Sequence, residues 1–531
     1  MEKHNLIELK DIDRYRNMLD VKVWGSEENH FKLRHAKSVK CERYGGFGIG
    51  RHGGGARSVI LDDLQVKGSG LTPLAGITKN LNYAHGTLTL NDAVLEVIYS
   101  GVLDRLLPHG VIPCRAIYYT GKEGSFEYDW RAGFPSASLD ESIVLKKTHG
   151  AILIRDNCNR PAHYMRAGEF DPKDIYAEFI SADLIRIRNI IKDLDEDGAK
   201  NFISTIVNFL TKCADQFSFS WIAGLMHGGI SPSNISVEGA WLDLATSTFI
   251  DRGKDFLIVE YEFSNEYKRV ESIIKEWVYT FSKYSGKELG SRPLIELYNT
   301  SFNEKKAYHF PYILGLARNK ETMEVILANY CRSFTDICKL ITPSGRTYGV
   351  PEIGMANAFH PSDYICGMAL TPDSEIQKLY RDIYSLNDRP LSFNAFLTQA
   401  LLKCTKRDYL ASKYYKNNVE ENLELKLECH APELFIDSFI ETYISDSEWI
   451  FSDEFYVNEV VYRDSVIDIF YDTSSNSFKK RNSSGIVSIN VVSELEAVIT
   501  GNRNSANRIY VSYLNRIEFI YSELRKYIGS H

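Results

Sequence analysis

The chain has 531 residues, of which 44% are hydrophobic and 12% aromatic, and its formal net charge is -8. This is enough apolar material for two or three folded domains, while the net negative charge argues against nucleic acid or an anionic membrane as a partner. No stretch approaches the roughly 20 apolar residues of a membrane span, and the amino terminus lacks the apolar core of a secretory signal, so we expect a cytoplasmic protein without membrane insertion. The nine cysteines lack C-x-x-C spacing, so neither a zinc site nor a disulfide framework is expected.

The first expected elements are a glycine-rich turn and a β-hairpin. Glycines gather at 44–48 and 53–55, just before the apolar run 58–61. This run turns at 62–63 into a second strand that ends in Lys67. Backbone amides beside glycines can approach phosphates closely, and a lysine supplies a point charge to them. The segment therefore predicts a nucleotide-binding turn.

A small sheet and a helical region should follow. The pattern predicts a helix over about 91–107 and strands at 112–119 and 152–154, which together indicate a small antiparallel sheet with one packed helix. We assign 1–168 to this amino-terminal lobe. Asp171-Pro172 is a typical helix start, and a second helix presents one apolar face over 202–213, so 169–370 is expected to form a helical lobe.

The most informative segment is His-Gly-Gly-Ile-Ser-Pro-Ser-Asn-Ile-Ser at 227–236, because Asp243 follows nine residues after Asn234. An Asn and an Asp at this separation are the pair with which kinase-type sites hold Mg²⁺ against nucleotide phosphates. The sequence thus predicts ATP and Mg²⁺ as cofactors, bound in a cleft between the two lobes. His227 is expected to organise the loop through hydrogen bonds rather than to act as a base.

The last part, 371–531, is expected to be a mixed carboxyl-terminal extension that could bind a partner or substrate. Helical patterns continue through 269–284 and 323–340, followed by a loop at 342–354. Further on, 472–485 is rich in Ser, Asn and Lys and reads as an exposed loop between two β-like runs, 457–471 and 486–492.

Four blocks in order carry a family resemblance. Gly-Gly-Ala-Arg at 54–57, Gln-Val-Lys-Gly-Ser-Gly-Leu-Thr-Pro at 65–73, Gly-Ala-Ile-Leu-Ile-Arg at 150–155 and the 227–243 block resemble the SelO family of kinase-fold proteins that transfer AMP. The similarity covers roughly residues 40–255. It implies an α+β, bilobal protein-kinase-like (SelO-like) fold with a small antiparallel-sheet N-lobe, a helical C-lobe and a C-terminal extension.

The resemblance also implies roles for individual residues. Lys67 matches the phosphate-binding lysine and Glu96 its helix partner, although the segment after Glu96 is longer than in the family. Arg57 stands where the family's Gly-Asp-Gly-Arg places its arginine. The glycines that would line the nucleotide are Gly54, Gly55 and Gly68.

The remaining site residues come from later segments. Arg155 and Arg166 resemble the two arginines that hold phosphates in an inverted nucleotide pose, and their wider separation indicates an inserted loop. Asn234 and Asp243 match the metal ligands. Together with Lys67 and Glu96, this pair forms the expected catalytic set.

One departure from the family changes the expected chemistry. The family has an acidic residue, proposed as general base, where this chain has Ser233. Ser is a poor base, whereas a carboxylate acceptor with a pKa near ~3.5 is already ionised and needs none. The hypothesis is that this branch activates a carboxylate as an acyl-adenylate and releases pyrophosphate.

Length and drifted motifs are also similar to those of SelO-like proteins in siderophore-microcin maturation clusters. Those proteins work with an acyltransferase-like partner to join the carboxyl-terminal Ser of a precursor peptide to a glucosylated siderophore. The substrate expected from this likeness is a precursor peptide or protein. Three alternatives stay open: a free-standing AMPylator of Ser, Thr or Tyr, an ordinary kinase, and a nucleotide-binding pseudokinase scaffold for a partner.

Overall fold

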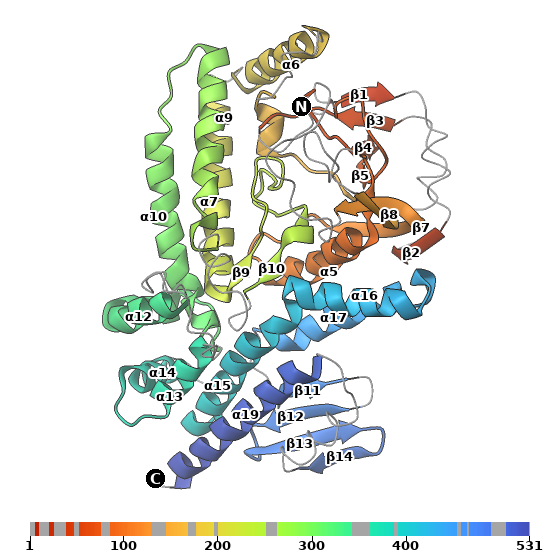
Figure 1. Ribbon diagram of the computed structural model, residues 1–531. Coiled ribbons are helices and arrows are strands. Elements are labelled where there is room, and N and C mark those ends of the chain that lie inside the picture. The colour runs from red at the N-terminus through yellow and green to blue at the C-terminus, as the bar shows by residue number, and fades with distance from the viewer. Residues whose placement is uncertain are drawn as a thin grey trace, which may run out of the picture.

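The computed structural model describes residues 6–9, 21–25, 39–46, 52–75, 85–128, 145–167, 177–195, 200–250, 263–341, 360–386, 391–453, 458–464, 467–489 and 506–529. It combines an antiparallel sheet near the amino terminus, a long helical region and a second, smaller sheet near the carboxyl terminus (Figure 1). The predicted α+β class is confirmed at this level. None of the helices in the described ranges is both long and apolar enough to cross a membrane.

The amino-terminal sheet is antiparallel throughout the described pairings, with the order β1-β3-β4-β5-β8-β7-β2 and with β6 paired to β8. Its strands are β1 Leu6–Leu9, β2 Val21–Gly25, β3 Val39–Glu42, β4 Ser58–Leu61, β5 Leu64–Lys67, β6 Leu88–Thr89, β7 Cys114–Tyr128 and β8 Leu145–Asp156. The predicted hairpin is β4–β5, which turns at Asp62 with a positive φ of 52°. The predicted strands at 112–119 and 152–154 fall in β7 and β8, and β7 begins at Cys114.

One helix, α5 (Leu90–Leu106), packs against this sheet and matches the predicted helix. It begins after Thr89, whose hydroxyl oxygen accepts a hydrogen bond from the Asp92 amide at 3.1 Å, a typical amino-terminal cap. The helix is buried around most of its circumference because the carboxyl-terminal helices cover it from the other side (Figure 1). This explains why apolar residues occupy more than one of its faces.

The helical region follows the sheet. Its helices are α6 Ala177–Asp195, α7 Lys200–Ala223, α9 Arg269–Ser285, α10 Arg292–His309, α11 Lys320–Asn329, α12 Cys331–Ile341 and α13 Pro361–Ala369. The helices predicted over 202–213 and 269–284 are confirmed as parts of α7 and α9. The pattern over 323–340 is divided into two helices at Tyr330. The predicted helix start at Asp171-Pro172 and the predicted loop at 342–354 lie outside the described residues.

The carboxyl-terminal part contains both helices and strands. It contains α14 Glu375–Ser385, α15 Phe393–Leu410, α16 Lys416–Cys429, α17 Ile436–Ile450, β11 Asn458–Arg463, β12 Asp468–Asp472, β13 Ser477–Asn482, β14 Gly485–Ser488 and α19 Ala506–Gly529. Strands β11 to β14 form an antiparallel sheet in chain order beside α15 and α19 (Figure 1).

The loop predicted over 472–485 is wrong, because this segment contains β13. The chain turns tightly at Asn476, which has a positive φ of 49°, and returns along β12. Phe478 is buried against Tyr471 and Tyr521, while the polar residues beside it are partly exposed. A strand that buries one aromatic side chain has too few apolar residues for its alternation to stand out in the sequence.

The carboxyl-terminal part also contacts α5 directly. The Tyr99 hydroxyl of α5 donates to the Tyr414 carbonyl at 2.6 Å. Gly101 of the same helix lies so close to Ile444 of α17 that an added Cβ would come within 2.4 Å of its side chain. Helix α5 therefore packs between the amino-terminal sheet and the carboxyl-terminal helices.

Candidate active site

The segment 227–243 forms a loop closed by a short antiparallel pair, β9 (Leu225–Met226) with β10 (Thr248–Phe249). His227 is fully buried in it. Its Nε2 donates to the Leu242 carbonyl at 2.9 Å, and its Nδ1 accepts from the Gly229 amide at 3.2 Å. Burial lowers the pKa of His227 to about 4, so the imidazole is neutral at neutral pH. His227 thus fastens the two ends of the loop, as expected.

Two neighbouring segments hold this loop in place. The carboxylate of Glu266 accepts from the His227 amide at 2.9 Å and from the Gly228 amide at 2.7 Å. On the other side, the Trp241 carbonyl accepts from the Ile112 amide at 2.8 Å, just after α5. The loop is therefore fixed relative to the helix that carries Glu96.

Four of the predicted site residues meet in one buried cluster. Lys67 from β5 lies 2.7 Å from Glu96 of α5 and 2.5 Å from the carboxylate of Asp243. Arg155 from β8 pairs with the same two carboxylates, at 2.8 Å from Asp243. The side chain of Asp243 is 29% exposed, against 1% to 8% for the other three. Asp243 is thus the member of the cluster that faces solvent.

The cluster holds two cations and two anions, and each stabilises the charge of the others. Burial opposes the charge of Lys67, but Asp243 and Glu96 outweigh it and raise the pKa of the amine. Burial likewise opposes ionisation of Asp243, yet Arg155 and Lys67 hold its pKa well below the usual value. Lys67 and Asp243 are therefore both charged at neutral pH. Such a cluster of facing cations and carboxylates can exchange its internal ion pairs for an anion and a metal ion.

Asp243 also has an unusual backbone conformation, with φ of 62° and ψ of 53° in the left-handed region. Residues other than glycine adopt it rarely, although Asp and Asn are the best tolerated, and such strain clusters at functional sites. The neighbouring Leu242 amide donates to the Asn234 carbonyl at 3.1 Å, which ties the two expected metal ligands to adjacent backbone segments.

The oxygen donors of Asn234 and Asp243 suit Mg²⁺, which is usually held by one or two carboxylates together with substrate phosphates. The Asn234 amide is oriented by its Nδ2, which donates to the Gly229 carbonyl at 2.7 Å, so its Oδ1 is the acceptor side. Within the described residues, no three His, Cys, Asp or Glu side chains are grouped to hold a metal by themselves. A metal at this site would need oxygens from a ligand.

The glycine-rich segment lies beside Lys67. The Gly68 amide donates to the Arg57 carbonyl at 2.9 Å, and the Gly55 amide donates to the Glu42 carbonyl at 3.0 Å. Gly68 has a φ of 89°, and a Cβ there would lie 2.7 Å from the Ala151 carbonyl oxygen. A Cβ on Gly54 would lie 2.4 Å from the Glu42 carbonyl oxygen. Close backbone packing therefore already requires glycine at 54 and 68.

The two outer arginines have partners beyond the four residues of the cluster. Arg57 donates to the Thr87 carbonyl at 2.9 Å. Arg166 lies 3.3 Å from Asp183 and donates to the Tyr284 hydroxyl at 3.2 Å, while its carbonyl accepts from the Gly46 amide at 3.1 Å. Arg166 thus lies against Gly46, in the first of the two groups of glycines.

The structure adds a second buried network that the sequence reasoning missed. The Glu42 carboxylate accepts from Gln65 at 3.0 Å and from His163 at 2.8 Å, and it also pairs with Arg160. Burial opposes ionisation, but Arg160 and His163 hold the pKa of Glu42 at about 2. Arg160 in turn donates to the Ser233 carbonyl at 3.1 Å.

Gln65 joins the two networks. Its Oε1 accepts from Arg155 Nε at 2.7 Å, so a continuous chain of bonds runs from Asp243 through β5 to the carbonyl of Ser233. One signal for it was present in the sequence. Gln65 is a polar residue in a short apolar strand, two positions before Lys67, and side chains two apart in a strand share a face.

Comparisons with known proteins do not assign a family. No protein-family model matches this chain, and no curated protein matches it significantly. The function is therefore inferred from the motifs and from the geometry of the site.

Proposed function

We propose that this protein is an ATP- and Mg²⁺-dependent adenylyl-transfer enzyme of bilobal SelO-like fold, which activates the carboxyl-terminal carboxylate of a precursor peptide as an acyl-adenylate. The observation that carries this proposal is the buried cluster of Lys67, Glu96, Arg155 and Asp243. It brings residues from two strands, a helix and the 227–243 loop to one point. A cluster with a structural role alone has no need for a strained, partly exposed aspartate at its open side.

The cluster has the groups that are needed to bind a nucleoside triphosphate. Lys67 and Arg155 offer positive charge to phosphate oxygens, and Asn234 and Asp243 offer the oxygen ligands of Mg²⁺. The metal would neutralise charge that develops on the phosphates. On binding, Asp243 would exchange its ion pairs with Lys67 and Arg155 for the metal, which frees both cations for the ligand.

The acceptor is inferred from the surroundings of Ser233. Its hydroxyl is buried and bonded to Ser231 at 2.9 Å and to Asn234 Oδ1 at 3.2 Å, and no described carboxylate bonds to it. A positioned base contributes about 10²–10⁴-fold to attack by a hydroxyl, and this position does not offer one. A carboxylate oxygen needs no deprotonation before it attacks the α-phosphorus, with cleavage of the bond to the leaving pyrophosphate.

The acyl-adenylate formed in this step would be the substrate of an acyl transfer. In the maturation setting suggested by the motifs, an acyltransferase-like partner would pass the activated peptide carbonyl to a glucosylated siderophore. The acyltransferase-like partner and the siderophore are proposed from the likeness in length and in the drifted motifs.

The deciding experiment uses ATP labelled at either the α- or the γ-phosphate, with Mg²⁺, host lysate and any copurifying partner. Formation of AMP and pyrophosphate without stable label on protein would support carboxylate activation. Stable α-label on protein would favour the AMPylator of Ser, Thr or Tyr, and transfer of γ-label would favour a kinase. No consumption of ATP would favour the pseudokinase scaffold.

The matching test variant is Asp243→Asn. Asn tolerates the left-handed backbone of Asp243 nearly as well as Asp does, so this variant removes the charge and keeps the local conformation. It should keep the native fold with reduced stability, because Lys67 and Arg155 lose one carboxylate partner, and it should lose turnover by about 10²-fold or more, since a group that stabilises developing charge is lost. Equal product from the variant would contradict a catalytic role for Asp243.

A further inference from the structure

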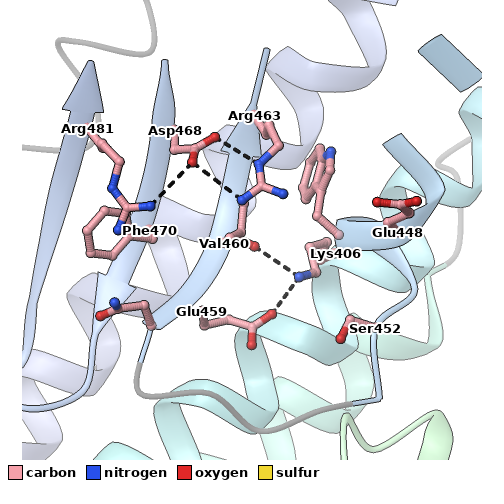
Figure 2. Close-up of a pocket in the computed structure, with 11 residues that line it drawn as sticks. Lys406, Glu448, Ser452, Glu459, Val460, Arg463, Asp468, Phe470 and Arg481 are labelled. Carbon is pink, nitrogen blue, oxygen red and sulfur yellow. Dashed lines mark hydrogen bonds and ion pairs between the residues drawn. The ribbon is translucent and has the colours of Figure 1, made fainter. Parts of the chain in front are cut away.

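A pocket of about 590 Å³ lies in the carboxyl-terminal part, between α15, the end of α17 and strands β11 to β13 (Figure 2). Its volume is in the range of sites for small organic ligands. Residues separated by as many as 75 positions in the chain, from Lys406 to Arg481, line it. The adenylyl-transfer proposal makes no use of this pocket.

The floor of the pocket is a buried ammonium group. The side chain of Lys406 is 2% exposed, and its Nζ lies 2.5 Å from a Glu459 carboxylate oxygen and 2.9 Å from the Val460 carbonyl (Figure 2). A lysine ammonium has three N–H donors, so among the described residues these two bonds leave one donor for a ligand. Lys403 approaches the other oxygen of the same carboxylate at 3.5 Å.

One wall is a row of charged side chains across three strands. The register aligns Asp468 of β12 with Arg463 of β11 and with Arg481 of β13. Figure 2 shows both arginines directed at this one carboxylate, with Arg463 Nε at 2.8 Å and Arg481 at 3.8 Å. Cross-strand neighbours of this kind share one face of the sheet.

The lining holds three cations and three carboxylates, but one of these carboxylates is paired with a cation outside the pocket, and one further lysine lies behind the lining. Lys403 and Lys406 share Glu459, and Arg463 and Arg481 share Asp468, so each pair of cations faces a single carboxylate. The further acidic residue of the lining, Glu448, is half exposed and pairs outside with Arg105.

The pKa values of the two buried amines show the cost of desolvation. Burial lowers the pKa of Lys403 to about 8 and also lowers the pKa of Lys406, although Glu459 opposes both shifts. An anion close to the two ammonium groups would offset their desolvation.

Aromatic faces stand beside the cations. The ammonium of Lys406 is 5.6 Å from the ring centre of Trp449, and the guanidinium of Arg481 is 5.1 Å from that of Phe470. Both rings line the pocket, and little of either residue is exposed to solvent. The ring of a ligand bound between these side chains would gain apolar contact, while its charged substituent would reach the cations.

We propose that this pocket binds a small aromatic anion, a ring that bears a carboxylate or a phosphate, with the charged group at Lys406, Arg463 and Arg481 and the ring against Trp449 and Phe470. Lys403 and Lys406 are buried and share one carboxylate, so an anion bound near Lys406 would stabilise both charges, while the half-exposed Arg463 and Arg481 offer further N–H donors at the wall. Arginine suits this role since its planar fork matches both carboxylate and phosphate oxygens.

The test uses the full chain without nucleotide, so its outcome is independent of adenylyl transfer. Saturation-transfer NMR titrations would compare benzoate and phenyl phosphate with benzyl alcohol and benzylamine. We expect at least one anion to bind about tenfold more tightly than the neutral alcohol, because a charge-assisted hydrogen bond is worth more than a tenfold change in affinity. The stronger of the two anions identifies the charged group as carboxylate or phosphate.

The variant Arg481→Gln should weaken binding of that anion about tenfold. Its side chain is 50% exposed, so the change should leave the fold intact. The control is Arg292→Gln on α10, where the arginine is 90% exposed and far from the pocket in the chain; it should bind as the wild type does. The proposal is overturned if neither anion binds saturably, if benzylamine or benzyl alcohol binds as tightly, or if Arg481→Gln retains full affinity.

Discussion

Replacement of Glu42 by Gln should destabilise the protein in a pH-dependent way. Glu42 is buried, and its pKa of about 2 lies well below the usual 4.5. Since each pKa unit corresponds to about 1.4 kcal/mol, ionised Glu42 contributes about 3 kcal/mol at neutral pH. This agrees with the ~3–5 kcal/mol lost when one partner of a buried ion pair is removed.

The local bonds explain why Gln is a poor substitute. The two Glu42 oxygens accept from Gln65, Arg160 and His163, whereas a Gln side chain would turn one donor toward another donor. A change of tautomer at His163 would relieve this only at the cost of the bond that its Nδ1 accepts from the Arg160 amide at 3.1 Å. Glu42→Gln should therefore lower the unfolding free energy by the whole contribution of ionised Glu42.

The sign of the pH dependence follows from the lowered pKa. A carboxyl whose folded-state pKa is depressed stabilises the fold above its unfolded pKa and loses that effect as the pH falls through the folded pKa. The difference in unfolding free energy between wild type and Glu42→Gln should thus be about 3 kcal/mol at pH 7 and about 1 kcal/mol at pH 3.

Urea unfolding followed by circular dichroism at several pH values measures this difference. The control is Glu296→Gln, an exposed residue of α10 that should change the unfolding free energy by less than about 0.5 kcal/mol at any pH. A loss for Glu42→Gln that is equal at pH 7 and pH 3 would refute the electrostatic reasoning and point to packing instead.

Three further predictions concern the proposed site. Gly68→Ala should destabilise the protein by about 1–3 kcal/mol in thermal melts, because its φ of 89° and the nearby Ala151 oxygen exclude a Cβ, while Gly367→Ala, in an open helical position, should be neutral or slightly stabilising. Ser233→Asp should not increase turnover on the true substrate if the acceptor is a carboxylate; a gain of about 10²-fold in product formation would instead indicate a hydroxyl acceptor. Chelation of Mg²⁺ should abolish AMP release by the wild type, and AMP release that continues at the same rate in the chelator would contradict metal-dependent catalysis.

Local patterns carried most of the predictions that the structure confirms. The β4–β5 hairpin follows from its turn residues, α5 from its length and apolar content, and the closed loop from His227 to Asp243 from its glycines and polar residues. Each depends on neighbours within about twenty residues, which is the range over which a sequence pattern acts. The motif resemblance then paired Lys67 with Glu96, and these side chains do meet.

Long-range packing decided the rest. The bonds from Gln65 through Glu42 and Arg160 to Ser233 join residues from two strands and two loops, and no spacing rule links them. Strand β13 escaped recognition since its polar sequence buries one aromatic residue only when β12 lies beside it. The carboxyl-terminal pocket likewise exists only because the β-sheet register aligns two arginines with one aspartate. The sequence alone determined most of the local elements, and tertiary packing decided which charges meet, because burial and distance set the energy of an ion pair.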